Sequence, residues 1–293
     1  MESLYSRSRF LDVDGARVCV AAFDPPAPAT GRRALLLHGN PAHVDHWKAL
    51  APLLRRRAQV VAFDHPGFGR SSDFADGTVT LERSARMGLA VLDALGVEGA
   101  VDVIGHSHGG MVAVAMASLA PERVRSLVLL GTGGTPAHAS YRLLPAVPGL
   151  ATALPMLGRA LFRTGALRPL ARTVLARAGQ QTFSPDPTPA GFVDEQLQEL
   201  GARPAVLGTM VRVSLDDPCG KIAAHARRVR APVLVIHGER DALVPIGYAR
   251  RLFAILRDAT KAARFVEIAG GHMGPLTHPE RVASLLEEWF GDA

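Results

Sequence analysis

Residues 101–110, V-D-V-I-G-H-S-H-G-G, constrain the fold of this chain more than any other stretch. An apolar run typical of a short buried strand comes first, and a stretch rich in Ala, Met and Val that predicts a helix follows it. Between them, residues 105–109 match the pattern G-x-S-x-G. In a turn that joins a strand to a helix, this pattern holds the serine in a strained conformation with its hydroxyl above the sheet edge. The segment therefore predicts that Ser107 is a nucleophile.

The predicted helix after Ser107 offers a site for negative charge. The first N–H groups of a helix have no partner within it, and the helix dipole favours an anion there. We therefore expect the N–H of His108 to stabilise an oxyanion. A second donor is expected from residues 38–41, H-G-N-P, because this turn follows a buried apolar run and can direct a backbone N–H toward Ser107.

The rest of the chain alternates between strand and helix patterns. Residues 10–23 predict a β-hairpin with an Asp14-Gly15 turn. Strands that alternate with helices indicate βαβ units and a mostly parallel sheet, so the expected fold class is α/β. The further predicted strands are 34–37, 60–63, 101–104, 124–130, 233–238 and 263–268, and the predicted helices are 45–54, 81–95, 111–120, 245–256 and 279–290.

The alternation stops at Gly131 and resumes near residue 232. We expect residues 1–133 and 231–293 to form the core and residues 134–230 to form a helical cap, with helical stretches at 160–178, 192–200 and 206–215. The cap holds 12 Lys+Arg, 11 of them Arg, against 6 Asp+Glu, whereas the rest of the chain is balanced. Solvated arginines explain this excess, and an anionic substrate is the alternative.

The composition excludes several classes of protein. The arginines are scattered without interleaved aromatic residues, which argues against a nucleic-acid partner. No run of 18 or more apolar residues is present, so we expect no membrane span. Cys19 and Cys219 are the only cysteines and lack the spacing of a metal site or a disulfide framework. A cytoplasmic location is expected, with no metal and no cofactor; the oligomeric state is not indicated.

An activated serine requires a base and an acid that orients the base. Residues 238–241, G-E-R-D, and residues 270–273, G-G-H-M, each follow a predicted parallel strand. Both therefore lie at the edge where open α/β sheets bind ligands. Asp241 is the expected acid and His272 the expected base. Glu239 is a rival for the acid, and His278 fits the start of a helix better than a base.

Several of these motifs, in the chain order Ser, Asp, His, resemble those of the serine branch of the α/β-hydrolase superfamily. The resemblance covers nearly the whole chain outside the cap. It implies an eight-stranded, mostly parallel sheet flanked by helices, with a helical cap inserted after the sixth strand. It also implies that Ser107 is the nucleophile, His272 the base and Asp241 its orienting acid, with the N–H groups of Asn40 and His108 as the oxyanion hole.

The H-G-N-P turn is similar to that of haloalkane dehalogenases, which use an aspartate nucleophile followed by a tryptophan. Ser107 and His108 occupy those positions here, and a serine cannot supply that carboxylate. The same difference argues against an epoxide hydrolase, as does a cap with one tyrosine, Tyr141, where two are typical. Among the other polar residues, we expect Asp64 and Arg70 to hold their loop together and His43 and His46 to be surface histidines.

The leading hypothesis is a hydrolase of carboxylic esters, including thioesters or lactones, that works through an acyl-enzyme. The expected partner is a small ester-like molecule, with an anionic group if the cap arginines contact it. A carbon–carbon bond hydrolase of the same fold is an alternative, although Gly39-Asn40-Pro41 does not match the usual oxyanion loop of those enzymes. A ligand receptor that retains the three catalytic residues is a second alternative.

Overall fold

The computed structural model describes residues 2–23, 31–133, 168–202, 206–215, 218–260 and 262–292. These residues contain one eight-stranded sheet, as predicted, and its strand order is β1-β2-β4-β3-β5-β6-β7-β8. The first two strands are antiparallel to their neighbours, and the other six are parallel. The strands are β1 (Ser8–Val13), β2 (Ala16–Phe23), β3 (Arg33–Leu37), β4 (Gln59–Phe63), β5 (Val101–His106), β6 (Val124–Leu130), β7 (Val233–Gly238) and β8 (Ala263–Ile268).

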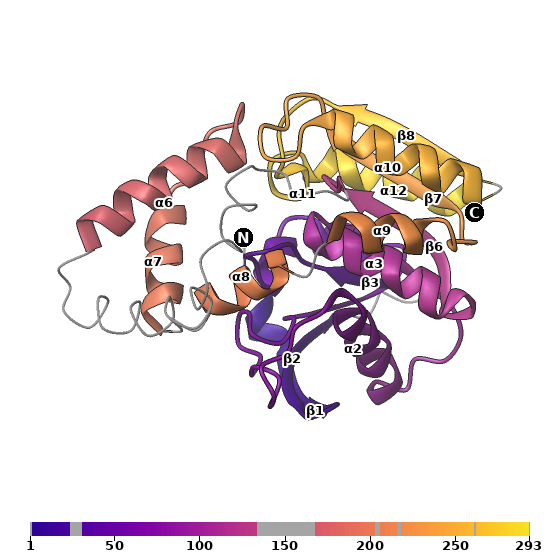
Figure 1. Cartoon of the computed structure of the whole chain (residues 1–293), viewed down its shortest axis with the longest axis horizontal. Coiled ribbons are helices and arrows are strands. Elements are labelled where there is room, and N and C mark those ends of the chain that lie inside the picture. Colours follow the sequence, from indigo (N-terminus) through magenta and orange to yellow (C-terminus); the bar gives the residue numbers. More distant parts are fainter. Residues whose placement is uncertain are drawn as a thin grey trace.

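Helices cover both faces of this sheet (Figure 1). One apolar core lies between the sheet and α2 (Leu81–Ala94), α3 (His108–Leu119), α9 (Pro218–Ala226) and α10 (Ile246–Ala259). The other lies between the sheet and η2 (Val44–Trp47), α1 (Ala51–Leu54) and α12 (Pro279–Asp292). The residues of β3 after Arg33 are all apolar because both faces of the strand are buried. Leu35 and Leu37 enter the first core, and Ala34 and Leu36 enter the second.

Among the described residues, four helices lie between β6 and β7 in the chain. They are α6 (Arg168–Phe183), α7 (Phe192–Ala202), α8 (Val206–Leu215) and α9. Figure 1 shows α6 and α7 on one side of the sheet layers, with α8 between them and the core. Helix α9 instead packs on α3 and α10, and its Ile222 and Ala226 join the core. The domain boundaries at 133 and 231 stay predictions, and residues 134–167, which include Tyr141, lie outside the described residues.

Two predicted helices differ from the structure. The helix expected at 45–54 is the 3-10 helix η2 followed by the short α1. Pro52 lies in the first turn of α1, and proline cannot donate the backbone bond that a continuous helix would need. The helical stretch predicted at 160–178 is described from Arg168 onward as α6, which runs to Phe183. Pro169 lies in the first turn of α6, where proline is tolerated.

The shorter helices are η1 (Leu4–Arg7), η3 (Pro121–Arg123) and α11 (Gly274–Thr277). The predicted hairpin turn is present, with φ of 47° at Asp14 and 72° at Gly15. Within the described part of the chain, no helix combines the length and apolarity that crossing a membrane requires.

Candidate active site

The turn between β5 and α3 holds Ser107 in a backbone conformation that few residues other than glycine adopt. Its φ is 54° and its ψ is −119°. The close packing of this turn requires glycine at two neighbouring positions. A Cβ on Gly105 would collide with the carbonyl of Gly109, and a Cβ on Gly109 would collide with the carbonyl of Leu37. The strained turn predicted from G-x-S-x-G is therefore present, and it places Ser107 at the carboxyl edge of the sheet.

Asp241 and His272 form a buried pair at the same edge. Nδ1 of His272 donates to Oδ2 of Asp241 at 2.8 Å. Oδ1 of Asp241 accepts from the backbone N–H groups of Leu243 at 2.9 Å and Val244 at 2.7 Å. Burial alone would raise the pKa of Asp241, but the hydrogen bond from His272, the electrostatic interaction with that ring and the Val244 N–H outweigh burial and lower it. Asp241 is thus an ionised acceptor that leaves Nε2 of His272 to accept a proton.

The structure brings the serine turn and the histidine loop together. Nε2 of His106, the residue before Ser107, donates to the carbonyl of His272 at 2.9 Å. Gly131, directly after β6, packs on the ring of His272, because a Cβ there would lie 3.2 Å from Nδ1. In the described residues Oγ of Ser107 has no hydrogen bond, so its bond to His272 is not formed here. Such bonds often form only when substrate is bound.

The H-G-N-P turn packs against Ser107. Nε2 of His38 accepts from the His65 N–H at 2.9 Å, so Nδ1 carries the proton and donates to the carbonyl of Gly39 at 2.8 Å. Burial lowers the pKa of His38 to about 3, which keeps its ring neutral. A Cβ on Gly39 would lie 3.2 Å from Cβ of Ser107. The backbone N–H of Asn40 has no acceptor in the structure described here.

Two cap elements contact this edge. Nδ2 of Asn40 donates to the carbonyl of Met210 in α8 at 3.3 Å. The end of α6 meets the histidine loop, because a Cβ on Gly271 would collide with the carbonyl of Ser184. The inserted helices therefore contact Asn40 and Gly271, the residue before the expected base.

The rival residues lie elsewhere. Glu239 is exposed and does not contact His272. His278 hydrogen-bonds Oγ1 of Thr277 at 2.8 Å and lies 3.7 Å from Asp186. Asp64 holds its loop, as expected, because its carboxylate accepts from the N–H groups of Val44 at 2.7 Å and Arg70 at 2.8 Å.

A group of buried histidines that was not predicted from the sequence surrounds Asp241 and His272. His46 was expected at the surface, which is wrong: it is buried, its ring centroid lies 4.4 Å from that of His106, and burial lowers its pKa well below the usual value. Burial also lowers the pKa of His106, to about 3. His237 touches Asp241 from β7. The signal available was their position, since His106 lies inside G-x-S-x-G and His237 four residues before Asp241.

The edge offers no evident metal site. In the part of the chain that the structure describes, no group of three or more His, Cys, Asp or Glu side chains is arranged to hold a metal ion. The histidines pack ring against ring instead, and His38, His106 and His237 each donate to a backbone carbonyl through one nitrogen.

Residues 35–279 match the family described as alpha/beta hydrolase fold. Because this match covers most of the chain and the sheet order agrees with it, the chain belongs to the α/β-hydrolase family and is an enzyme of that family.

Several individual proteins are similar to this chain over most of its length. The chain is 29% identical to 2-hydroxymuconate semialdehyde hydrolase from Pseudomonas putida over 277 residues, which cover 90% of this chain and 88% of the relative. It is 30% identical to the enzyme of the same name from Pseudomonas sp. strain CF600, over 88% of this chain and 87% of the relative. A solved structure of the meta-cleavage product hydrolase from Pseudomonas fluorescens IP01 superposes with a TM-score of 0.75 at 18% identity, over 97% of both chains. A putative lipase from Acinetobacter baumannii AYE gives 0.77 at 21% identity, over 98% of this chain and 92% of the other.

Proposed function

We propose that the protein hydrolyses a carbon–carbon bond next to a carbonyl group in a conjugated hydroxy-oxo acid. The observation that carries this proposal is the set of relatives whose substrates, by name, are compounds such as 2-hydroxymuconate semialdehyde and 2-hydroxy-6-oxononadienedioate. Such compounds contain no ester, so hydrolysis has to break a carbon–carbon bond. This alternative from the sequence analysis is better supported than its leading hypothesis of ester hydrolysis.

In this proposal His272 takes the proton of Ser107 while Oγ attacks the carbonyl carbon. The N–H groups of Asn40 and His108 stabilise the oxyanion. Before this bond can break, the enol of the substrate has to shift its proton to the carbon next to the attacked carbonyl, which gives the keto form. The carbon–carbon bond then breaks, its electron pair is delocalised as a dienolate over the unsaturated keto fragment, and that fragment takes up the proton held by His272. Water, deprotonated by His272, finally releases the acyl group from Ser107. One water is consumed, and an acid and a shorter hydroxydienoate leave.

Asp241 supports each of these proton transfers. It keeps the proton of His272 on Nδ1, so that Nε2 is the atom that takes and returns protons. It also stabilises the charged ring between the two steps. Because the acid is buried and held by two backbone N–H groups as well, the orientation of the base is fixed before substrate arrives.

Ester hydrolysis is the second candidate. It needs the same nucleophile, base and oxyanion donors, and the departure of Gly39-Asn40-Pro41 from the usual loop of carbon–carbon bond hydrolases favours it. The two candidates differ in the leaving group, because an alkoxide needs no conjugation to leave whereas a carbanion does.

The test compares wild type, Ser107→Ala and the control Glu239→Gln. A fluorophosphonate probe reports whether the serine is activated. Turnover is then measured on 2-hydroxymuconate semialdehyde and on p-nitrophenyl esters from acetate to decanoate. The proposal expects labelling and turnover of the semialdehyde in wild type and in the control, and neither in Ser107→Ala.

Turnover of esters without turnover of the semialdehyde or of longer hydroxy-oxodienoates would transfer the assignment to the second candidate. No labelling of the folded wild type would contradict both hydrolase assignments and favour the receptor alternative. Substrate capture that slows as salt is added would implicate cap arginines in binding the substrate carboxylate, because salt screens attraction between charges.

A further inference from the structure

A cavity of about 390 Å³ opens at the edge of the sheet opposite the candidate active site. Arg33 and Gln59, which line it, are the first residues of β3 and β4. Ser107, by contrast, follows the carboxyl end of β5. The cavity therefore shares no residue with the candidate active site and needs an explanation of its own.

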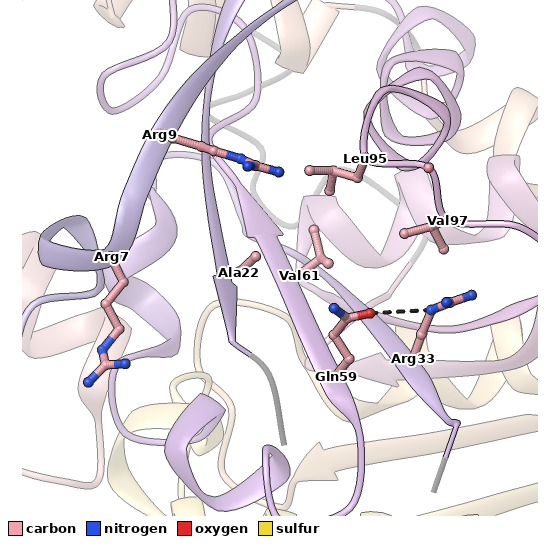
Figure 2. Close-up of a pocket in the computed structure, with 9 residues that line it drawn as sticks. Arg7, Arg9, Ala22, Arg33, Gln59, Val61, Leu95 and Val97 are labelled. Carbon is pink, nitrogen blue, oxygen red and sulfur yellow. Dashed lines mark hydrogen bonds between the residues drawn. The ribbon is translucent and has the colours of Figure 1, made fainter. Parts of the chain in front are cut away.

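The cavity exists because α2 ends before it covers these strands. Its floor is formed by Ala22 of β2 and Val61 of β4, and one wall by Leu95 and Val97 in the turn after α2. Gly96, with φ of 66°, turns the chain away from the sheet between them. Figure 2 shows Arg9 extending from β1 toward Leu95 above this apolar floor.

Three arginines border the cavity, and none of them pairs with a carboxylate among the described residues. Arg7 and Arg9 are exposed, and their guanidinium groups make no hydrogen bond or ion pair with the residues that the structure describes. Arg33 donates to neutral groups, Oε1 of Gln59 at 3.2 Å and the carbonyl of Glu98 at 3.1 Å. In Figure 2, Arg9 and Arg33 lie at different ends of the cavity.

Some surface arginines elsewhere in the described part of the chain have acidic partners. Arg83 pairs with Asp76 at 2.5 Å, Arg123 with Asp93 at 2.6 Å and Arg250 with Glu267 at 2.6 Å. The negative C-terminal end of α2 does not require Arg7, Arg9 or Arg33 as a partner, because its last carbonyls already accept hydrogen bonds from backbone N–H groups. The N–H groups of Gly96 and Val97 donate to Asp93 and Leu92 at 2.9 Å.

We propose that this cavity binds a small organic anion that carries carboxylate or phosphate groups on an apolar frame. Guanidinium groups are always charged and can bind such oxygens through two parallel hydrogen bonds. The apolar floor would contact the carbon frame, and the volume falls within the range of small-molecule sites. The anion would supply negative charge that the described residues do not provide to these three side chains.

Citrate and inorganic phosphate are the probes for this site. Binding is measured by calorimetry on the full chain at constant ionic strength, so that general screening is held fixed. The test variant is Arg7→Gln/Arg9→Gln, which removes two charges and no contact that the structure shows. The matched control is Arg250→Gln/Arg264→Gln, which removes the same charge elsewhere on the surface.

The proposal expects saturable binding of at least one probe to wild type and to the control, and binding at least tenfold weaker in Arg7→Gln/Arg9→Gln. Ser107→Ala should bind as wild type does, because its site is at the other edge. In wild type, the bound probe should also protect Arg9 and Arg33 from phenylglyoxal, as read by mass spectrometry. No saturable binding to wild type, equal binding by the test variant, or loss of binding in Ser107→Ala would each overturn the proposal.

Discussion

Nε2 of His237 lies 3.4 Å from Oδ2 of Asp241 and 2.8 Å from the carbonyl of Val244. A carbonyl only accepts, so this nitrogen carries a proton and is shared between the carboxylate and the backbone. Burial lowers the pKa of His237, which keeps the ring neutral. His237 therefore fixes both ends of the loop that carries the expected acid.

Replacing His237 by Leu should lower kcat about fivefold, because the loop that carries Asp241 loses the hydrogen bond from His237 to the Val244 carbonyl, and such a bond contributes about 1 kcal/mol. The two backbone donors and His272 still hold Asp241, so the loss should be much smaller than that of Asp241→Asn, expected at roughly 10⁴-fold. Steady-state kinetics with both variants measures this order. Glu239→Gln is the control and should behave as wild type; a Leu variant with wild-type kcat would contradict the role of His237.

Asn40→Ala should lower kcat/KM about tenfold while leaving the oxyanion donor in place. The variant keeps the backbone N–H of residue 40 and loses only the side-chain bond to Met210, so it separates α8 from the oxyanion loop. Unfolding stability should fall by about 1 kcal/mol, the usual contribution of one hydrogen bond. Arg172→Gln, at an exposed ion pair within the cap, should change neither quantity; unchanged kinetics in Asn40→Ala would show that the α8 contact is incidental.

Gly109→Ala should destabilise the fold by several kcal/mol, because the new methyl group meets the backbone of Leu37 and His38 and neither can move away. Gly247→Ala is the opposite case. No atom lies within 4 Å of its new Cβ, so the higher helix propensity of alanine in α10 should raise the free energy of unfolding by about 0.5–1 kcal/mol. Urea unfolding monitored by circular dichroism compares the two, and similar effects would contradict the packing described for the serine turn.

The stability of the protein should fall as the pH is lowered from about 6.5. His106 has a folded-state pKa of about 3 against 6.5 for an ordinary histidine. Below pH 6.5 the histidine binds a proton in the unfolded chain but not in the native state. The free energy of unfolding therefore falls by up to about 1.4 kcal/mol per pH unit from this group until the pH approaches 3. Above pH 6.5 the group contributes no pH dependence. His106→Gln should make the decline shallower.

Urea unfolding at pH 7, 6, 5 and 4 measures both slopes. His278→Gln, at a half-exposed histidine, is the matched control and should keep the wild-type slope. Equal slopes for wild type and His106→Gln would mean that His106 takes up its proton in the folded state.

The fold was predictable because its signals are local. The apolar runs of β3 and β5, the glycines of the serine turn and the turn residues at Asp14 each constrain the backbone within a few residues. The pair of Asp241 with His272 was predictable for a related reason, since each residue follows a parallel strand and parallel strands end at one edge.

The histidines around the pair could not be predicted in the same way. Whether His46 is buried depends on helix η2 lying against His106, a residue 60 positions along the chain. His237 becomes a partner of Asp241 only through the path of the loop between them. The cavity bordered by Arg9 and Arg33 likewise depends on where α2 stops over the sheet, which no local pattern specifies.

The strained conformation of Ser107 means that folding and chemistry favour different residues at this position. Glycine adopts a positive φ at no steric cost, so Ser107→Gly should relieve strain of order 1 kcal/mol and yield a chain that is more stable yet inactive. Mutational drift that is tested only for folding would thus tend to replace Ser107 by glycine. If Ser107 is the proposed nucleophile, only selection for the reaction itself would keep a serine at this position.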